Sequence, residues 1–208
     1  MDAITQLLES LISKHAQPIP QALCLHGLTL AIPAIIEAVE NGTSRPAREA
    51  MAHAALLSGL ALANSGLGMA HGVAAALGVH ASIPHGLACA VMLPQALKVN
   101  REAGRTTLAQ AGRVMRQSLI NSNLSELSAR ELAKMASLGS DDAATEFVIQ
   151  IVEHLCERIG IPITLTKLGV SRDQIPAIVA SSHGNSMSGN PKEISDEELT
   201  TLLESMTA

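Results

Sequence analysis

The sequence contains two histidine-glycine pairs, in the segments GLGMAHG (residues 66–72) and IPHG (residues 83–86). Pro84, directly before His85, predicts the start of a helix. Glycine after each histidine leaves room beside the imidazole for a metal ion, water or another ligand. Because a histidine near the end of one helix and another at the start of the next can converge on one point, we expect His71 and His85 to form part of a metal site. Two histidines make half a coordination shell, so further ligands must come from elsewhere in the chain.

The pattern of apolar residues predicts a succession of helices and no convincing strand. Apolar residues recur at intervals of three and four, and proline or glycine breaks separate the segments. The expected helices cover residues 4–12, 18–41, 46–61, 70–79, 84–99, 106–118, 128–137, 141–159, 171–182 and 195–206. The alanine-rich helix from Pro46 carries little charge and is expected to be buried on all sides and central. We therefore predict an all-α, compact multi-helix bundle that forms a single domain over residues 1–208.

Composition argues against several classes of protein. The chain has 208 residues, 47% of them hydrophobic, which is enough for one sizeable core. A net charge of −5 without basic clusters, and the absence of Trp and Tyr, argue against a nucleic-acid partner. The apolar runs are interrupted before the roughly 18 residues that a bilayer crossing needs, and the N-terminus lacks the basic start of a signal peptide. We expect a cytoplasmic protein with no membrane partner.

The three cysteines, Cys24, Cys89 and Cys156, are odd in number and widely spaced in apolar helical pattern. This placement predicts reduced, buried thiols. It argues against disulfides and against a thiolate metal site.

The two histidine segments resemble the signature of iron-containing (group III) alcohol dehydrogenases. The match runs through NSGLGMAHG (64–72), LG (77–78), PHGLACAVMLP (84–94) and Asn100, and it extends to MDAITQ (1–6), AREAM (47–51) and SMSGNP (186–191). The resemblance covers essentially the whole chain and implies the C-terminal helical metal-binding domain of this family, within the dehydroquinate synthase-like superfamily. It also implies that the family's N-terminal nucleotide-binding α/β domain is absent from this sequence.

The resemblance implies four metal-ligand positions, which are Asp2, Gln6, His71 and His85. In the family an aspartate and a histidine four residues later hold a divalent ion, iron or zinc, together with two further histidines. Gln6 departs from this pattern, either as a weak fourth ligand or as a hydrogen-bonding neighbour of the ligands. Because an amide oxygen is a poorer donor to a transition metal than imidazole, we expect weak or absent metal binding that Gln6→His would strengthen.

Three further positions are expected to border the substrate. Ala75 stands where many family members carry another histidine, and His183 and Ser186 lie in a loop that resembles the family loop beside the substrate cleft. His80 is expected in a solvated loop between two helices.

The resemblance implies hydride transfer between a nicotinamide ring and a small alcohol or aldehyde, with the metal as a Lewis acid. The chain has no Gly-x-Gly-x-x-Gly turn between a strand and a helix, so NAD(P) binding is expected only together with the α/β domain, whether missing or separate. The first hypothesis is the helical half of a metal-dependent NAD(P)-linked alcohol dehydrogenase, inactive without its nucleotide-binding half.

The alternative hypothesis is a non-catalytic helical relic or interaction module with a degenerate metal site. A di-iron helical protein is a weaker third hypothesis, because paired Glu-x-x-His motifs are absent. A helical half without its partner would expose apolar surface, so a homo-oligomer stays open.

Overall fold

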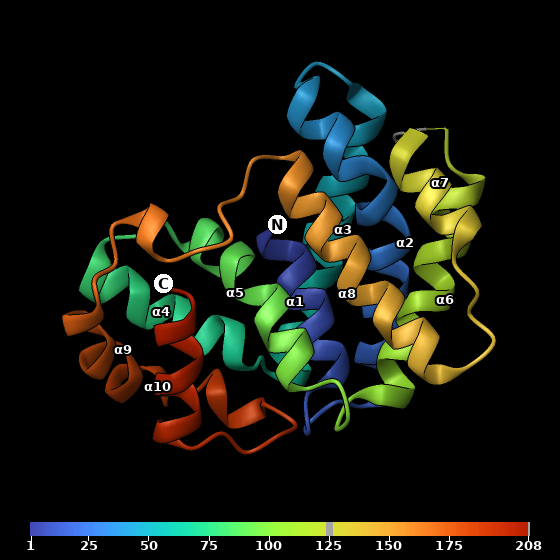
Figure 1. Ribbon diagram of the computed structural model, residues 1–208. Helices are drawn as coiled ribbons and strands as arrows, with labels where there is room; N and C mark the ends of the chain where they lie inside the picture. Colours follow the sequence, from blue (N-terminus) through green and yellow to red (C-terminus); the bar gives the residue numbers. More distant parts are fainter. Residues whose placement is uncertain (124–126, 208) are drawn as a thin grey trace.

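The computed structural model describes residues 1–123 and 127–207, which form ten α-helices, three short 3-10 turns and no strand (Figure 1). The helices are α1 (Asp2–Ile12), α2 (Pro18–Glu40), α3 (Arg45–Ser65), α4 (Met69–Ala81), α5 (His85–Val99), α6 (Arg105–Asn121), α7 (Leu127–Met135), α8 (Asp141–Arg158), α9 (Ile175–Ser182) and α10 (Asp196–Ser205). The predicted all-α class is confirmed. The single domain predicted over residues 1–208 also takes in residues 124–126 and 208, which lie outside the described residues.

Helix α1 is the central helix, and its two faces have different chemistry. Ile4, Leu8 and Leu11 are fully buried on one face. Asp2 and Glu9, which are seven residues apart, lie together on the other face, because this spacing is two helical turns. Helix α1 packs against α2, α3, α4, α5 and α6. Helices from both sides of the molecule therefore surround α1 (Figure 1).

Two hydrophobic clusters lie on either side of α1. The first core contains buried side chains of α1, α2, α3, α6 and α8, with Phe147 among the largest. The second core contains buried side chains of α4, α5, α9 and α10. Helix α5 contributes to both, through Leu93 and Leu97 in the first core and Ala88 and Cys89 in the second. The polar face of α1 thus meets α4 and α5 at the junction of the two cores.

The prediction that the alanine-rich helix is buried and central was wrong. Helix α3 packs one face against α1 and α2, where Ala54, Leu57 and Ala61 are buried. Its opposite face is open, and Leu56 and Leu60 are 62% and 48% exposed. Low charge and many alanines make it possible to bury a helix. Small side chains, however, gain little free energy when every face is buried, because they carry little apolar area.

Helix α2 is long and apolar enough to cross a membrane by length and composition alone, contrary to the expectation that no run reaches that length. Half of its most apolar window is buried inside the protein. Cys24, Leu28 and Ile32 belong to the first core, where α2 packs against α1, α3 and α6. Core packing therefore explains the hydropathy of this buried face.

Two local expectations also need correction. Residues 171–182 do not form one helix, because a 3-10 turn over Arg172–Gln174 precedes α9, which has a proline in its first turn. His80 does not lie in a loop but in the last turn of α4, where its Nε2 lies 2.7 Å from Ser181 Oγ.

The packing of α6 against α8 yields a stability prediction. A Cβ atom on Gly112 would overlap the backbone carbonyl of Ala144, so Gly112→Ala is expected to lower the free energy of unfolding by about 1–3 kcal/mol. Gly59, in the interior of α3, has no atom near the position of an added Cβ. As the matched control, Gly59→Ala should leave stability unchanged or raise it by up to about 1 kcal/mol. Equal effects of the two substitutions in urea unfolding would contradict this packing.

Candidate metal centre

The approach of α4 to α1 depends on two glycines. Gly66 ends α3 with a φ of +69°, a conformation that favours glycine, and the chain axis turns by 101° between α3 and α4. Gly68 precedes α4, and a Cβ there would lie 2.8 Å from Asn190 Oδ1 and 3.0 Å from Glu9 Oε1. The absence of a side chain at position 68 therefore lets two distant side chains reach the start of α4.

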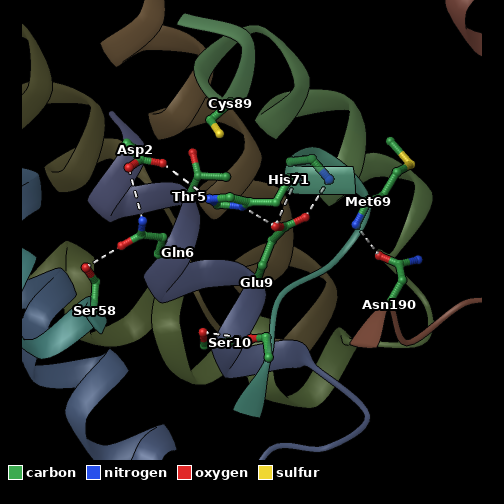
Figure 2. Close-up of polar contacts among 12 residues, drawn as sticks. Asp2, Thr5, Gln6, Glu9, Ser10, Ser58, Met69, His71, Cys89 and Asn190 are labelled. Atoms are coloured by element: carbon green, nitrogen blue, oxygen red, sulfur yellow. Dashed lines mark hydrogen bonds and ion pairs between the residues drawn. The ribbon is translucent and has the colours of Figure 1, made fainter. Parts of the chain in front are cut away.

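Those two side chains cap the first turn of α4 (Figure 2). The Met69 backbone N–H donates to Asn190 Oδ1 at 3.0 Å, and the Ala70 N–H donates to Glu9 Oε1 at 2.6 Å. The His71 N–H donates to Glu9 Oε2 at 3.3 Å. A carboxylate also interacts favourably with the positive end of the helix dipole. Glu9 is 2% exposed, so its charge is stabilised by these donors and not by water.

Four side chains from three helices bring donor atoms to one point beside this cap. Asp2 Oδ1 lies 3.2 Å from His71 Nε2 and 3.7 Å from His85 Nε2, and the two imidazole centroids are 5.5 Å apart. Cys89 Sγ lies 3.6 Å from His85 Nε2. One donor atom from each of Asp2, His71, His85 and Cys89 lies within 4.8 Å of the others.

The spacing of these atoms fits a tetrahedral divalent ion. Bonds of about 2.0–2.3 Å at tetrahedral angles place neighbouring ligand atoms about 3.3–3.6 Å apart. The observed separations of 3.2 and 3.7 Å from Asp2 Oδ1 and of 3.6 Å from Cys89 Sγ are close to that range. Oxygen, imidazole nitrogen and sulfur are all ligands that zinc accepts, and oxygen and nitrogen also suit iron.

Gln6 lies beside this group, and both the nitrogen and the oxygen of its amide form hydrogen bonds. Its Nε2 donates to Asp2 Oδ2 at 3.0 Å, and its Oε1 accepts from the Ser58 hydroxyl at 2.7 Å (Figure 2). Turning the amide over would place its oxygen against the Asp2 carboxylate, which has no proton to donate. Of the two roles considered for Gln6, the geometry favours the hydrogen-bonding neighbour, which links Asp2 to α3.

Glu9 also fixes the orientation of the His71 ring. His71 Nδ1 lies 2.6 Å from Glu9 Oε2, and Nδ1 must carry a proton for this contact to be a hydrogen bond. The opposite nitrogen, Nε2, then faces Asp2 and the ligand group. Carboxylate partners of this kind orient metal-ligating histidines and raise their basicity.

The electrostatics place a proton on His71 when no metal is bound. Burial opposes a charge on this imidazole, but hydrogen bonds to Asp2, Cys89 and Glu9 outweigh that effect and raise the pKa of His71 to about 11. The hydrogen bond to His71 in turn lowers the pKa of Asp2, against partial burial. Burial raises the pKa of the Cys89 thiol. An imidazolium between two carboxylates therefore supplies the positive charge that the acidic groups need.

The group is closed on one side and open on the other. The His71 side chain is 4% exposed, whereas the Asp2 and His85 side chains are 39% and 55% exposed. The group is therefore accessible to solvent at Asp2 and His85 and closed at His71.

The two glycines after the histidines serve different purposes. A Cβ on Gly72 would lie 2.8 Å from the Ser182 carbonyl oxygen, so this glycine allows α9 to pack closely and leaves no room for a ligand. Gly86 has only the Cβ of Asp2 nearby, at 3.8 Å from an added Cβ. His71 also lies in the first turn of α4, not near the end of a helix as expected.

The structure separates the residues expected to border the substrate. Ala75 is exposed on α4, one turn after His71. His183 Nε2 lies 2.7 Å from Asp196 Oδ1, and His183 lines a different cavity of about 350 Å³. Ser186 directly precedes the 3-10 turn Met187–Gly189, which packs against α4 at Gly72. A role for these three positions at the substrate stays a prediction.

Sequence reasoning missed Cys89 and Glu9. The expectation of reduced, buried thiols is confirmed, because all three cysteines are free and buried. The sequence did not indicate that the Cys89 sulfur lies among the donor atoms of the ligand group, and the argument against a thiolate metal site stays a prediction. The spacing of Cys89, four residues from His85, was the available signal, since positions i and i+4 share a helix face. No local pattern marks Glu9, whose partners are more than 60 residues away.

The fold and this ligand group define an all-helical domain with a candidate metal centre at the junction of its two cores. The profile of the Fe-containing alcohol dehydrogenase family, C-terminal, matches residues 1–207. The chain therefore belongs to the iron-containing alcohol dehydrogenase family.

Individual relatives agree with this assignment. The chain is 34% identical to 1,3-propanediol dehydrogenase of Klebsiella pneumoniae over 97% of its own length and 48% of the relative's. A crystal structure of 1,3-propanediol oxidoreductase superposes with a TM-score of 0.84 and 31% identity, over 99% of this chain and 50% of that one. Sulfoacetaldehyde reductase from Bifidobacterium kashiwanohense, solved with NAD+, gives a TM-score of 0.81 and 25% identity over 100% and 48% of the two chains. The chain thus spans about half the length of the relatives it matches.

The buried carboxylate of Glu9 yields a prediction about stability. Glu9→Gln keeps the shape of the side chain but replaces one acceptor oxygen by a donor, which leaves N–H groups at the start of α4 without a partner. We expect the free energy of unfolding to fall by about 2 kcal/mol. Glu49→Gln removes an exposed ion pair with Arg45 and, as the control, should change stability by less than about 0.5 kcal/mol. Equal losses in chemical denaturation would refute the capping role.

The raised pKa of His71 yields a prediction about pH. The stability that comes from the charged imidazole is fully present below the unfolded pKa of 6.5 and is lost as the pH rises towards about 11. In chelator-treated protein, the stability advantage of wild type over His71→Gln should therefore shrink by at least about 1 kcal/mol between about pH 7 and pH 9.5. An advantage that stays constant over this range would show that His71 is neutral.

Proposed function

We propose that this chain is the metal-binding and substrate-binding half of an alcohol or aldehyde oxidoreductase that uses NAD(P). The observation that carries the proposal is the convergence of donor atoms from Asp2, His71 and His85 on one open-sided point. Membership of the iron-containing alcohol dehydrogenase family supports the same reading.

A divalent ion bound here would supply a Lewis acid for the oxygen of the substrate, which favours hydride transfer to or from the neighbouring carbon. Asp2, His71 and His85 would hold that ion. Glu9 keeps the His71 ring in the orientation that presents Nε2, and Gln6 holds the carboxylate of Asp2 by its second oxygen. The exposed edge at His85 admits a small alcohol or aldehyde.

The nicotinamide cofactor would be held by a nucleotide-binding α/β domain. The relatives are about twice as long as the matched region, and one of them is solved with NAD+. With such a domain seated against this chain, the substrate would react between the two halves. This partner domain belongs to the proposal together with the reaction itself.

Metal binding is the first test. Zinc or ferrous ion at 100 times its dissociation constant should stabilise the chain by about 2.7 kcal/mol, measured by thermal or chemical unfolding. His85→Ala should abolish this gain, because it removes a ligand. His26→Ala, the matched control on α2, should retain the full gain. If the two variants respond to metal alike, the ion does not bind at the proposed centre.

Activity is the second test. Without a nucleotide-binding half the nicotinamide is not positioned, and positioning supplies several kcal/mol of the barrier reduction, about 7–11 kcal/mol in favourable cases. The chain alone should therefore show no NAD(P)H oxidation with a panel of simple aldehydes. Joined to an α/β half that binds NAD(P)H, it should show turnover that His71→Ala abolishes. Turnover by the chain alone would contradict the proposal, as would an inactive joined protein that binds both metal and cofactor.

A further inference from the structure

We propose that Cys89 supplies the fourth protein ligand of the metal centre, in place of the side chain at position 6, and that the centre is consequently a zinc site. This inference rests on the proposed function, because it concerns the same ion. It goes further by assigning a ligand set and a metal preference to this chain.

The first observation is the geometry of α5. His85 opens this helix and Cys89 follows one turn later, so both side chains leave the same helix face. Cys89 Sγ lies 3.6 Å from His85 Nε2, and it is within 4.8 Å of the donor atoms of Asp2 and His71. A sulfur bond of about 2.3 Å and a nitrogen bond of about 2.05 Å at the tetrahedral angle place those two atoms about 3.5 Å apart.

The second observation is that Gln6 is not available as a ligand. Its nitrogen donates to Asp2 Oδ2 and its oxygen accepts from Ser58, so the amide turns its N–H side to Asp2 and its oxygen to α3. The hydrogen-bond partners of the Cys89 thiol are Asp2, His71 and His85, which belong to the ligand group themselves, and its side chain is fully buried. The family's fourth ligand is an imidazole at the position of Gln6 on α1. In this chain the thiol of Cys89 on α5 takes its place as the fourth ligand.

The third observation is charge balance. The ion would be held in a half-buried place, where an uncompensated charge is costly. With Asp2 and a Cys89 thiolate as ligands, the two negative charges cancel the charge of a divalent ion. The negative charge of Glu9 is already compensated by the first turn of α4. On binding of the ion, the S–H bond of Cys89 and the Nε2–H bond of the His71 imidazolium would both break, and the two protons would pass to water.

A thiolate ligand changes which metal the site prefers. Thiolates favour zinc and other soft or borderline ions, and zinc already binds more tightly than ferrous ion to most protein ligands. The Cys89 thiolate should therefore increase the affinity of the site for zinc relative to ferrous ion, although the family takes its name from iron.

Cobalt(II) is the probe for the test, because a cobalt–thiolate bond gives a charge-transfer band in the near ultraviolet that oxygen and nitrogen ligands do not give. The wild-type chain should show this band on titration with cobalt. Cys89→Ser should lose the band and bind zinc at least about tenfold more weakly, which is about 1.4 kcal/mol. Cys24→Ser, a substitution of a buried thiol in the first core, should keep both the band and the affinity.

The outcomes distinguish a failure of Cys89 as a ligand from a failure of the metal centre itself. If wild type binds cobalt without a sulfur band, Cys89 is not a ligand and this inference is overturned, while the metal centre stands. If wild type binds neither cobalt nor zinc, the metal centre fails and the inference fails with it. The cobalt spectrum and the zinc titration of wild type together decide between these two cases, so these outcomes do not depend on the folding of a variant.

A second arm tests the exchange of ligands. In the Cys89→Ser background, Gln6→His should restore zinc affinity by supplying an imidazole, without restoring the sulfur band. In the wild-type background, Gln6→His should raise zinc affinity by less than about threefold, or about 0.65 kcal/mol, because the fourth position is already taken. A gain of about tenfold or more from Gln6→His in wild type would instead show that position 6 is the ligand position.

Discussion

The buried carboxylate of Glu9 is the interaction on which the rest of the site depends. It joins α1 to the first turn of α4 through two backbone N–H groups and to His71 through the ring Nδ1. A charge in this position is stable only because donors surround it, and those donors exist only where a helix begins. The same contact therefore fixes the packing of two helices, the start of one of them and the direction of an imidazole.

The location of the site follows from this contact. Helix α1 buries leucine and isoleucine side chains in the first core and turns its polar face towards α4 and α5, which carry the second core. Asp2 and Glu9, on one face of α1, meet His71 and Cys89 across the junction (Figure 2). The His85 side chain is half exposed at this junction, so one side of the ligand group stays accessible.

Much of the fold could be predicted from the sequence, because the spacing of apolar residues and the positions of proline and glycine are local signals. The boundaries of α2, α5 and α8 lie within one or two residues of those expected. The burial of α3 could not be predicted, since composition does not say which face finds a partner. For the site, the two histidine-glycine pairs indicated His71 and His85, and the family resemblance added Asp2. Glu9 and Asn190 act through contacts between distant parts of the chain. Gln6 occupies the expected place, but its hydrogen bonds to Asp2 and Ser58 appear only in three dimensions.

A crystal structure of the zinc-loaded chain, with anomalous scattering recorded at the zinc edge, tests the central claim most directly. The predicted result is one strong anomalous peak within about 2.0–2.3 Å of an Asp2 carboxylate oxygen, His71 Nε2 and His85 Nε2, with Glu9 still bonded to His71 Nδ1. A peak at another place, or a zinc-soaked crystal in which Asp2 and His71 keep their direct contact with no ion beside them, would contradict the claim that this junction is a metal centre.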